Sequence, residues 1–249
     1  MARTFGGVST DKVVSALTAH ATQRSYHQWT YRTGAGGNSQ GRLFEKTNGG
    51  AQVEVFLNSN AAVTYNYFRS WSGTDGNWSI PQPAVNEWHQ IGASYDAGAT
   101  TNDPLMYIDG VSQTVTQVTG DPTGSVDTNT DTYVFGNNGA STRNWAGRLC
   151  EFAVWNRILT AGEWAALGAG FSPLFFPDSL VEYIPLVREV ISLKLAPPTA
   201  TGTVVVEHPR IIYPTSFQDR RFTTAGAAAG GLTDWPKFQR RGFWGWDFS

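Results

Sequence analysis

A regular succession of short strand-like runs and turn clusters between residues 26 and 139 limits the fold of this chain more than any other feature. The runs are rich in aromatic and β-branched residues, which favour strands. Turn clusters such as GAGGNSQG, SGTDGN and DAGATTND interrupt the runs roughly every eight to twelve residues. Punctuation at this spacing predicts an antiparallel all-β sandwich or barrel.

Individual strands can be assigned inside this pattern. The dipeptide Asp109-Gly110 lies between two alternating runs and is the strongest local hairpin signal, because a type I′ turn needs positive φ at both central positions. The predicted strands are QVEVFLN (52–58) and VTYNYF (63–68), which form a hairpin, HQIGASYD (89–96), the two halves of PLMYIDGVSQTV (104–115), and TYVFGNN (132–138).

The stretch GRLCEFAVWNRILTAGEWAAL, residues 147–167, changes its hydrophobic rhythm halfway along. Its first part alternates as a strand does, which predicts that Cys150, Phe152 and Val154 share one face. Glu151 lies between these apolar residues, and it is either a catalytic carboxylate or an ordinary side chain of the scaffold.

The second part of that stretch carries the signature of a helix start. Thr160 and Glu163 have the spacing of a capping box, in which each residue satisfies a free backbone N–H of the first turn. We therefore expect a short helix over 161–167, which Gly168 can terminate.

The composition argues against several classes of protein. A formal net charge of −2 supplies no basic field that would attract nucleic acid or an anionic membrane. The N-terminus lacks the apolar run of a signal peptide, and no segment approaches the roughly 18 apolar residues of a membrane span. The single cysteine, Cys150, is expected to be a small buried hydrophobe. We expect a chain that neither binds nucleic acid nor inserts into a membrane.

The character of the sequence changes beyond Gly170. SLVEYIPLVREVISLKL (179–195) is strand-like but is interrupted by Pro185, which suits an edge or a bend. TTAGAAAGG (223–231) has the composition of a linker, and it precedes an aromatic-rich terminus that a solvated tail would not carry. The expected domains are an N-terminal segment (1–22), a sandwich (23–213), and a linker with an aromatic C-terminal arm (214–249).

Four strings, in order, resemble a known family. They are NEWHQIGASYD, LMYIDGV, YVFGNN and WAGRLCEFAVWNRILTAGEWAAL, and they are similar to the signature of laminin G-like and pentraxin-like domains of the concanavalin A-like superfamily. The resemblance covers about residues 24–168. It implies an all-β antiparallel jelly-roll sandwich, here with one short helix and an extended C-terminal arm. Such domains mostly bind glycans or proteins, and some are glycoside hydrolases.

Two departures from the family pattern affect the interpretation. The string LVEYIPL (180–186) resembles the family's first strand but follows the helix, so residues 179–213 are expected to supply a permuted first strand. Cys150 stands where the family commonly has an acid before Glu151. The continuation EHPRIIYP (207–214) is similar to phage and prophage proteins that carry this fold.

The carboxylates give catalysis little support. Glycoside hydrolysis needs two carboxyl groups about 5–9 Å apart across the bond, and hydrolases of the superfamily take them from an E-x-D-x-E strand that this sequence lacks. We predict that the protein is not an enzyme and that Glu151 is a surface or interface carboxylate, or is paired with an Arg such as Arg148. The alternative is a divergent glycosidase with Glu151 as its candidate acid.

Calcium is the metal that the resemblance suggests, because laminin G-like and pentraxin-like relatives often bind it at a rim through oxygen ligands. The candidate ligands are Asp75, Asp96 and Asp103, which lie in turn-rich loops. The alternative is that these side chains cap backbone groups of turns. The four His residues show no zinc-ligand spacing, and no other cofactor is expected.

Glycan binding would need exposed aromatic rings, whose flat apolar faces and polar edges suit sugars. Trp71 and Trp78 in the turn-rich RSWSGTDGNWSIP are the predicted glycan-binding residues, and the alternative is that they pack on the sandwich edge. Four further Trp residues are expected in the core: Trp88, Trp145, Trp155 and Trp164.

The C-terminal arm combines basic and aromatic residues, the types most enriched at interface hot spots. It could dock on a neighbouring subunit or on its own sandwich. The predicted docking residues are Trp235, Arg240, Arg241, Phe243, Trp244 and Trp246.

These features lead to a functional hypothesis. We predict a non-enzymatic structural and binding module, a phage virion surface protein that decorates or cements a capsid or forms part of an appendage. Its partners would be virion proteins or copies of itself, with surface glycans as further ligands, and it would be assembled in the host cytoplasm. The main alternative is an extracellular glycan-binding lectin or host-adhesion module.

Overall fold

The computed structural model describes most of the chain up to residue 214. The described residues are 2–6, 10–17, 21–48, 51–59, 63–128, 132–186, 192–193 and 195–214. The first compact unit ends at Ile212. The predicted docking residues Trp235, Arg240, Arg241, Phe243, Trp244 and Trp246 lie outside the described residues.

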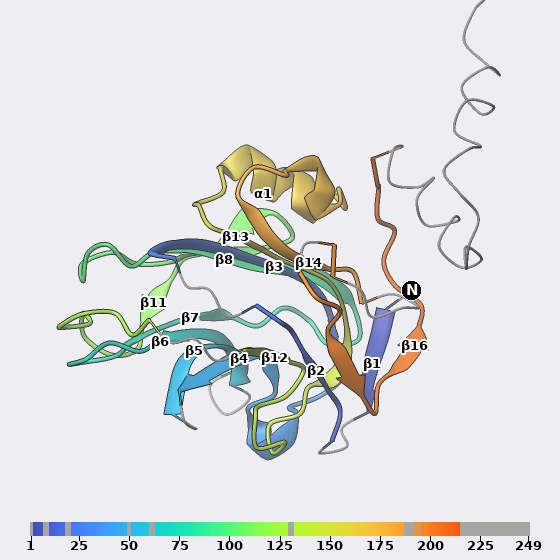
Figure 1. Ribbon diagram of the computed structural model, residues 1–249, viewed down its shortest axis with the longest axis horizontal. Helices are drawn as coiled ribbons and strands as arrows, with labels where there is room; N and C mark the ends of the chain where they lie inside the picture. Colours follow the sequence, from blue (N-terminus) through green and yellow to red (C-terminus); the bar gives the residue numbers. More distant parts are fainter. Residues whose placement is uncertain are drawn as a thin grey trace, which may run out of the picture. The chain divides into compact units, whose positions relative to one another are not determined.

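Two stacked antiparallel sheets form a sandwich, which confirms the predicted fold class (Figure 1). Sheet A has the order β10-β9-β8-β3-β13-β1-β16, with β14 also paired to β13, and sheet B has the order β11-β7-β6-β5-β4-β12-β2-β15. Sheet A consists of β1 (Ala2–Gly6), β3 (Gln23–Arg32), β8 (Trp88–Asp96), β9 (Leu105–Ile108), β10 (Val111–Ser112), β13 (Ala146–Trp155), β14 (Leu180–Ile184) and β16 (Val204–Val206). Sheet B consists of β2 (Lys12–Val14), β4 (Arg42–Asn48), β5 (Ala51–Ser59), β6 (Thr64–Arg69), β7 (Gly76–Pro81), β11 (Thr116–Gln117), β12 (Tyr133–Phe135) and β15 (Thr199–Thr201).

The local strand predictions are confirmed. β5 and β6 pair as a hairpin, and β8 and β12 occupy the predicted runs. Asp109 and Gly110 join β9 to β10 with φ values of 51° and 76°, the positive values that the type I′ turn requires.

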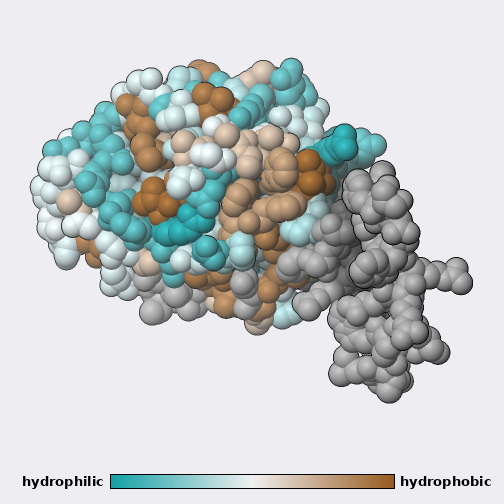
Figure 2. All heavy atoms as spheres, turned by 90° about the horizontal axis from the view of Figure 1, so that it is seen from above, coloured by the Kyte–Doolittle hydropathy of each residue, from teal (hydrophilic) through white to brown (hydrophobic). Residues whose placement is uncertain are grey.

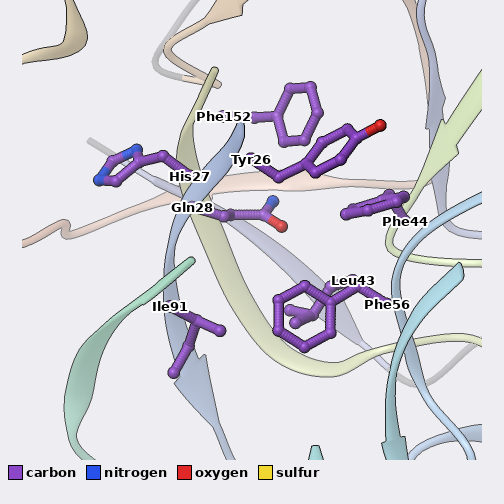
Figure 3. A pocket seen from close by; sticks show the side chains of 8 residues that line it. All are labelled: Tyr26, His27, Gln28, Leu43, Phe44, Phe56, Ile91 and Phe152. Atoms are coloured by element: carbon purple, nitrogen blue, oxygen red, sulfur yellow. The ribbon is translucent and has the colours of Figure 1, made fainter. Parts of the chain in front are cut away.

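Aromatic residues fill the space between the sheets. Alternation along each strand places one set of side chains inward, where Tyr26 stacks on Phe44 at 4.7 Å and Phe135 meets Phe152 at 3.9 Å. Figure 3 shows the middle of this core, where Gln28 lies among the inward rings while His27 points the opposite way.

The Gln28 side chain borders the small cavity drawn in Figure 3. Its amide nitrogen and oxygen have no hydrogen-bond partner among the described residues. The cavity has a volume of about 10 Å³, which is about what one water molecule needs. This interior space is therefore suited to one water molecule and not to a ligand.

The α-helix α1 (Ala161–Gly168) covers part of the outer face of sheet A (Figure 1). The predicted capping box between Thr160 and Glu163 is present and fixes its first turn. Trp164 stacks on Tyr107 of β9 at 4.7 Å, and a Cβ on Gly168 would lie 2.3 Å from the Asp109-Gly110 turn. The helix ends at a glycine because that glycine packs directly against the hairpin.

Two short 3-10 helices lie in the connections. The first, η1 (Gly37–Ser39), is in the glycine-rich loop before β4, and the second, η2 (Pro173–Phe175), follows α1.

Figure 2 looks onto the α1 side of the sandwich and shows a tan-to-brown apolar area near the middle, bordered by hydrophilic residues. The layer over sheet A thus has a mixed outer surface.

The N-terminal residues belong to the sandwich itself. β1 pairs with β13 in sheet A, and β2 pairs with β12 in sheet B. The sandwich therefore begins at β1 and not at the expected residue 23. β14, which contains most of the LVEYIPL string, pairs antiparallel with β13. That it replaces the family's first strand stays a prediction.

A β-bulge in β13 changes which residues share a face. The register with β3 shifts between Cys150 and Ala153, and Glu151 has a φ of 57°. Cys150 pairs with Trp29, and Ala153 pairs with His27, so both face the α1 side. The prediction that Cys150 shares a face with Phe152 and Val154 is wrong, because the bulge inserts one residue into the alternation.

Candidate ligand-binding surface

The outer face of sheet A near α1, where β14 pairs with β13, encloses Glu151, and we call this part of the molecule the covered end. The side chain is fully buried, and the Tyr183 hydroxyl donates a short hydrogen bond to its Oε2. The prediction of a surface carboxylate is therefore wrong, because Glu151 lies at the bulge and is enclosed beside Tyr183 of β14. Pairing with Arg148 is also wrong, since that guanidinium lies over the Tyr31 ring. No substrate reaches Glu151 in this arrangement.

His27 belongs to the same covered end. Its Nδ1 lies 2.8 Å from the Glu151 carbonyl oxygen, so this nitrogen carries the proton and donates. Burial lowers the pKa of His27 to about 4, and the imidazole is neutral near pH 7. With its edge against Trp155, this histidine is part of the packing.

A second enclosed polar group lies between the sheets around Glu54. The Tyr133 hydroxyl donates to Glu54 Oε2 at 2.6 Å, Tyr67 donates a short bond to Oε1, and Arg24 donates to the Tyr133 hydroxyl at 2.9 Å. Burial, together with the Glu54 charge, raises the pKa of Tyr26, Tyr67 and Tyr133. All of these side chains are buried, so the group ties the sheets together and presents no surface to a ligand.

The tryptophans predicted to bind glycans are buried. Trp71 is 6% exposed and Trp78 is 0% exposed. The Trp78 ring packs against Tyr67 and Tyr95, and its Nε1 donates to Asp103 at 2.6 Å. The prediction that Trp71 and Trp78 are exposed glycan-binding residues is wrong, and the alternative that they pack on the sandwich is confirmed, because the turn-rich segment folds their rings inward.

The three acids named as calcium candidates serve turns and neighbouring side chains. Asp75 accepts from the Trp71 backbone N–H at 2.9 Å, and Asp96 accepts from the Gly98 N–H at 2.8 Å. Asp103 accepts from the Trp78 indole. Among the residues that the structure describes, no three His, Cys, Asp or Glu side chains come together as a metal site. Calcium binding stays a prediction.

Among the residues that the structure describes, no helix covers the other end of the outer face of sheet A, and we call it the open end. Five residues on neighbouring strands line up there as direct cross-strand partners: Trp88 pairs with Tyr31, Tyr31 with Arg148, Arg148 with Thr4, and Thr4 with Val204. Paired residues point to the same side of a sheet. We call this set the open row, and at about 4.8 Å between strands it spans about 19 Å.

The first three members of the open row form a platform. Trp88 meets Tyr31 edge to face at 5.6 Å, and the Arg148 guanidinium carbon lies 4.7 Å from the Tyr31 ring centre. All three side chains are half-buried. The indole N–H, the phenol and the guanidinium make no hydrogen bond to any described residue, and none of these polar atoms is fully buried. They are therefore available to a ligand.

A surface depression of about 220 Å³ adjoins the platform at the β1–β13 pair. Its lining includes Arg148, two threonines and the start of β13 around Gly147. Gly147 has a φ of 139°, and a Cβ there would lie 1.9 Å from the Tyr31 carbonyl oxygen. Only glycine lets β3 and β13 approach this closely and set the Tyr31 and Arg148 side chains next to each other. The lining residues are Thr4, Phe5, Gly6, Thr33, Ala146, Gly147 and Arg148.

The sequence did not reveal the open row. Trp88 is predicted to lie in the core but is half-buried, and no sequence signal marks Tyr31. Trp145, Trp155 and Trp164 are buried as predicted. The row joins residues from position 4 to position 204, so it depends on the register of five strands. A local signal exists only for Trp88, which directly precedes its strand's alternating run.

Residues 5–164 match the family described as the concanavalin A-like lectin/glucanases superfamily. The match covers more than half of the chain, and the chain therefore belongs to this superfamily. No curated protein matches the sequence. Within the described residues, no helix is long and apolar enough to span a membrane.

Solved structures share the fold at low sequence identity. A candidate carbohydrate binding protein from Bacteroides ovatus is 13% identical with a TM-score of 0.59, and the alignment covers 82% of this chain and 58% of that one. The native heptameric SAP-like pentraxin from Limulus polyphemus is 15% identical with a TM-score of 0.51, and the alignment covers 67% of this chain and 81% of that one. At such identities, these likenesses establish the fold alone.

Proposed function

We propose that the protein is a non-catalytic binding module and that the open row binds a glycan. The observation that carries this proposal is the Trp88–Tyr31–Arg148 platform, because its apolar faces adjoin polar tips that no described residue satisfies. Aromatic rings supply apolar contact to the carbon-bound hydrogens of a sugar, and free donors can bind its hydroxyl groups. The superfamily and the B. ovatus structure, itself a candidate carbohydrate binding protein, support the same direction.

The shape of the open row suits an elongated ligand. About 19 Å of continuous sheet face would accommodate several linked sugar rings side by side. The adjoining depression of about 220 Å³ is smaller than the roughly 300–1,000 Å³ of sites for drug-sized ligands, which fits a single ring or a branch.

The absence of catalysis is part of the proposal. Hydrolysis would need two carboxyl groups beside the bound sugar, about 5–9 Å apart. Glu54, Glu151 and Glu182 are buried in polar groups of the interior, and none of the described residues that line the depression is a carboxylate. A glycan recovered after long incubation should be intact by mass spectrometry, and any shortened product would contradict this part.

A glycan array tests the proposal directly. Wild-type protein, Trp88→Ala and Tyr31→Ala are compared with Phe175→Ala, which removes an aromatic ring that is 39% exposed and is not a member of the open row. We expect the two open-row variants to lose about tenfold or more in affinity and the control to bind as the wild type does. Equal binding by all four proteins, or no binding by the wild type, would overturn it. Repeating the array with a chelator tests the calcium prediction.

A virion setting is a second, independent proposal, and it rests on the sequence alone. It is supported by the resemblance of EHPRIIYP (207–214) to phage and prophage proteins and by the aromatic C-terminal arm. In that setting, the module would sit on the virion surface and dock on a capsid or appendage protein or on copies of itself. Purified protein should bind stoichiometrically to particles that lack it, and failure to bind would contradict the proposal.

A further inference from the structure

Arg148 has a charge that no described residue neutralises. No ion pair or hydrogen bond joins its guanidinium to another described residue, and none of the described residues that line the depression is a carboxylate. By contrast, Arg42 and Arg157 each pair with a glutamate, at 2.8 Å and 2.5 Å. An arginine held in place without an acid is suited to an anion from outside.

The Tyr31 ring fixes the position of this cation without using its donors. A guanidinium over an aromatic face is held through its π surface, so its N–H groups remain free at the edge. Their forked arrangement matches the two oxygens of a carboxylate, and such paired hydrogen bonds are among the strongest in proteins. The site can therefore bind an anion in a defined orientation.

The surroundings of Arg148 favour a sugar as the carrier of that anion. Thr4 and Thr33 line the same depression, and Thr4 lies beside Arg148 in the open row. Trp88 and Tyr31 continue the surface on the other side as apolar faces. One charge, two threonines and two rings form a mixed surface that matches a charged sugar.

We infer that the open row recognises an anionic glycan and that Arg148 pairs with the carboxylate of an acidic sugar, a uronic or sialic acid, at the depression. This inference rests on the proposed glycan binding and names the chemical class of its ligand. Arg148 would set specificity, while Trp88 and Tyr31 would supply binding energy that neutral and acidic glycans share.

A matched pair of ligands tests the inference. The probes are a uronate-containing oligosaccharide, the same oligosaccharide with its carboxyl groups reduced to alcohols, and a sulfated neutral oligosaccharide. The proteins are wild type, Arg148→Gln, Arg148→Lys and the control Arg210→Gln, which changes an exposed arginine outside the open row. Affinities are measured by calorimetry at two salt concentrations.

We expect the wild type and the control to bind the uronate about ten- to hundredfold more tightly than the reduced form. Arg148→Gln should bind both forms with equal, weak affinity, and Arg148→Lys should keep a reduced preference because it keeps the charge but not the fork. The wild-type preference should shrink at high salt, a measurement that needs no variant. Tighter binding of the sulfated probe than of the uronate would overturn the assignment to a carboxylate.

The outcomes separate this inference from the proposal beneath it. If the wild type binds the reduced oligosaccharide as tightly as the uronate and loses both with Trp88→Ala, glycan binding stands and the role of Arg148 is overturned. A preference for the uronate that survives in Arg148→Gln also overturns it. If the wild type binds no glycan on the array, the proposed function itself fails.

Discussion

The covered and open ends of sheet A place the same kinds of aromatic residue in different surroundings. At the covered end, Trp164 and Tyr183 are fully buried, and each polar tip has a protein partner. At the open end, Trp88 and Tyr31 are half-buried, and their polar tips have none among the described residues. At the covered end, α1 lies over the sheet and β14 extends it beside β13, and no described helix does the same at the open end. Residue type alone therefore does not distinguish a core tryptophan from a partly exposed one in this fold.

The largest expected effect comes from removing a ring at each end. Trp164→Ala deletes a buried ring stacked on Tyr107 and should lower the free energy of unfolding by about 3–5 kcal/mol. Trp88→Ala should cost about 1 kcal/mol or less, because that ring is already partly in water. Urea denaturation of both variants measures the difference between these losses in free energy of unfolding. Equal losses would mean that Trp88 is packed as tightly as Trp164.

Gly147→Ala tests whether the open end depends on close strand contact. The new Cβ would meet the Tyr31 carbonyl at a backbone φ of 139°, so we expect a loss of roughly 3 kcal/mol and a weakened platform. Gly139→Ala is the control, since no atom lies within 4 Å of its Cβ position. The unfolding temperature and the glycan affinity should both decrease in Gly147→Ala and stay unchanged in Gly139→Ala.

The covered end should be sensitive to acid through His27. Because burial lowers its pKa to about 4, the unfolded chain, with a pKa near 6.5, takes up a proton first as the pH falls. Protonation of His27 therefore leaves the free energy of unfolding unchanged above pH 6.5. As the pH falls from 6.5 to 4, it lowers the free energy of unfolding by about 3 kcal/mol.

The comparison of wild type with His27→Gln isolates this term. Burial raises the pKa of Glu182, which favours the folded state at low pH, but that effect is common to both proteins. Denaturation across pH 4–7 should give a flatter stability curve for His27→Gln. Parallel curves would show that His27 is not enclosed as described.

The smallest effect is expected at the start of α1, which holds the cover in place. The Arg157 guanidinium lowers the pKa of Glu163 to about 2, and both side chains are partly exposed. Glu163→Gln should cost about 1 kcal/mol at pH 7, since solvent screens the pair. The difference in free energy of unfolding between wild type and Glu163→Gln should decrease as the pH falls from about 4.5 toward 2. A difference that stays constant in urea denaturation would contradict the ion pair.

Local signals in the sequence predicted the scaffold well. The Asp109-Gly110 turn and the Thr160–Glu163 capping box each follow from residues close together in the chain, and both are present. Signals of this kind depend on backbone sterics and on hydrogen bonds within one turn. The regular spacing of turn clusters predicted the sandwich for the same reason.

The site depended on contacts between distant segments, and these the sequence could not supply. The bulge that buries Glu151 depends on how β13 meets β3 and β14. Trp71 and Trp78 looked exposed because their segment is rich in turns, yet the loop folds them inward. The open row needs the registers of four strand pairs at once. Long-range pairing, and not propensity, decides which aromatic side chains remain in water.

The burial of Cys150 has a practical consequence. Its side chain is fully enclosed next to the bulge, and burial raises the pKa of the thiol well above its ordinary value. A thiol reagent should react with the native protein only when the packing around Cys150 opens, because the nucleophile is the exposed thiolate. With one cysteine in the chain, the rate of alkylation measures how often β13 opens locally. A ligand at the open end that stiffens β13 would lower that rate.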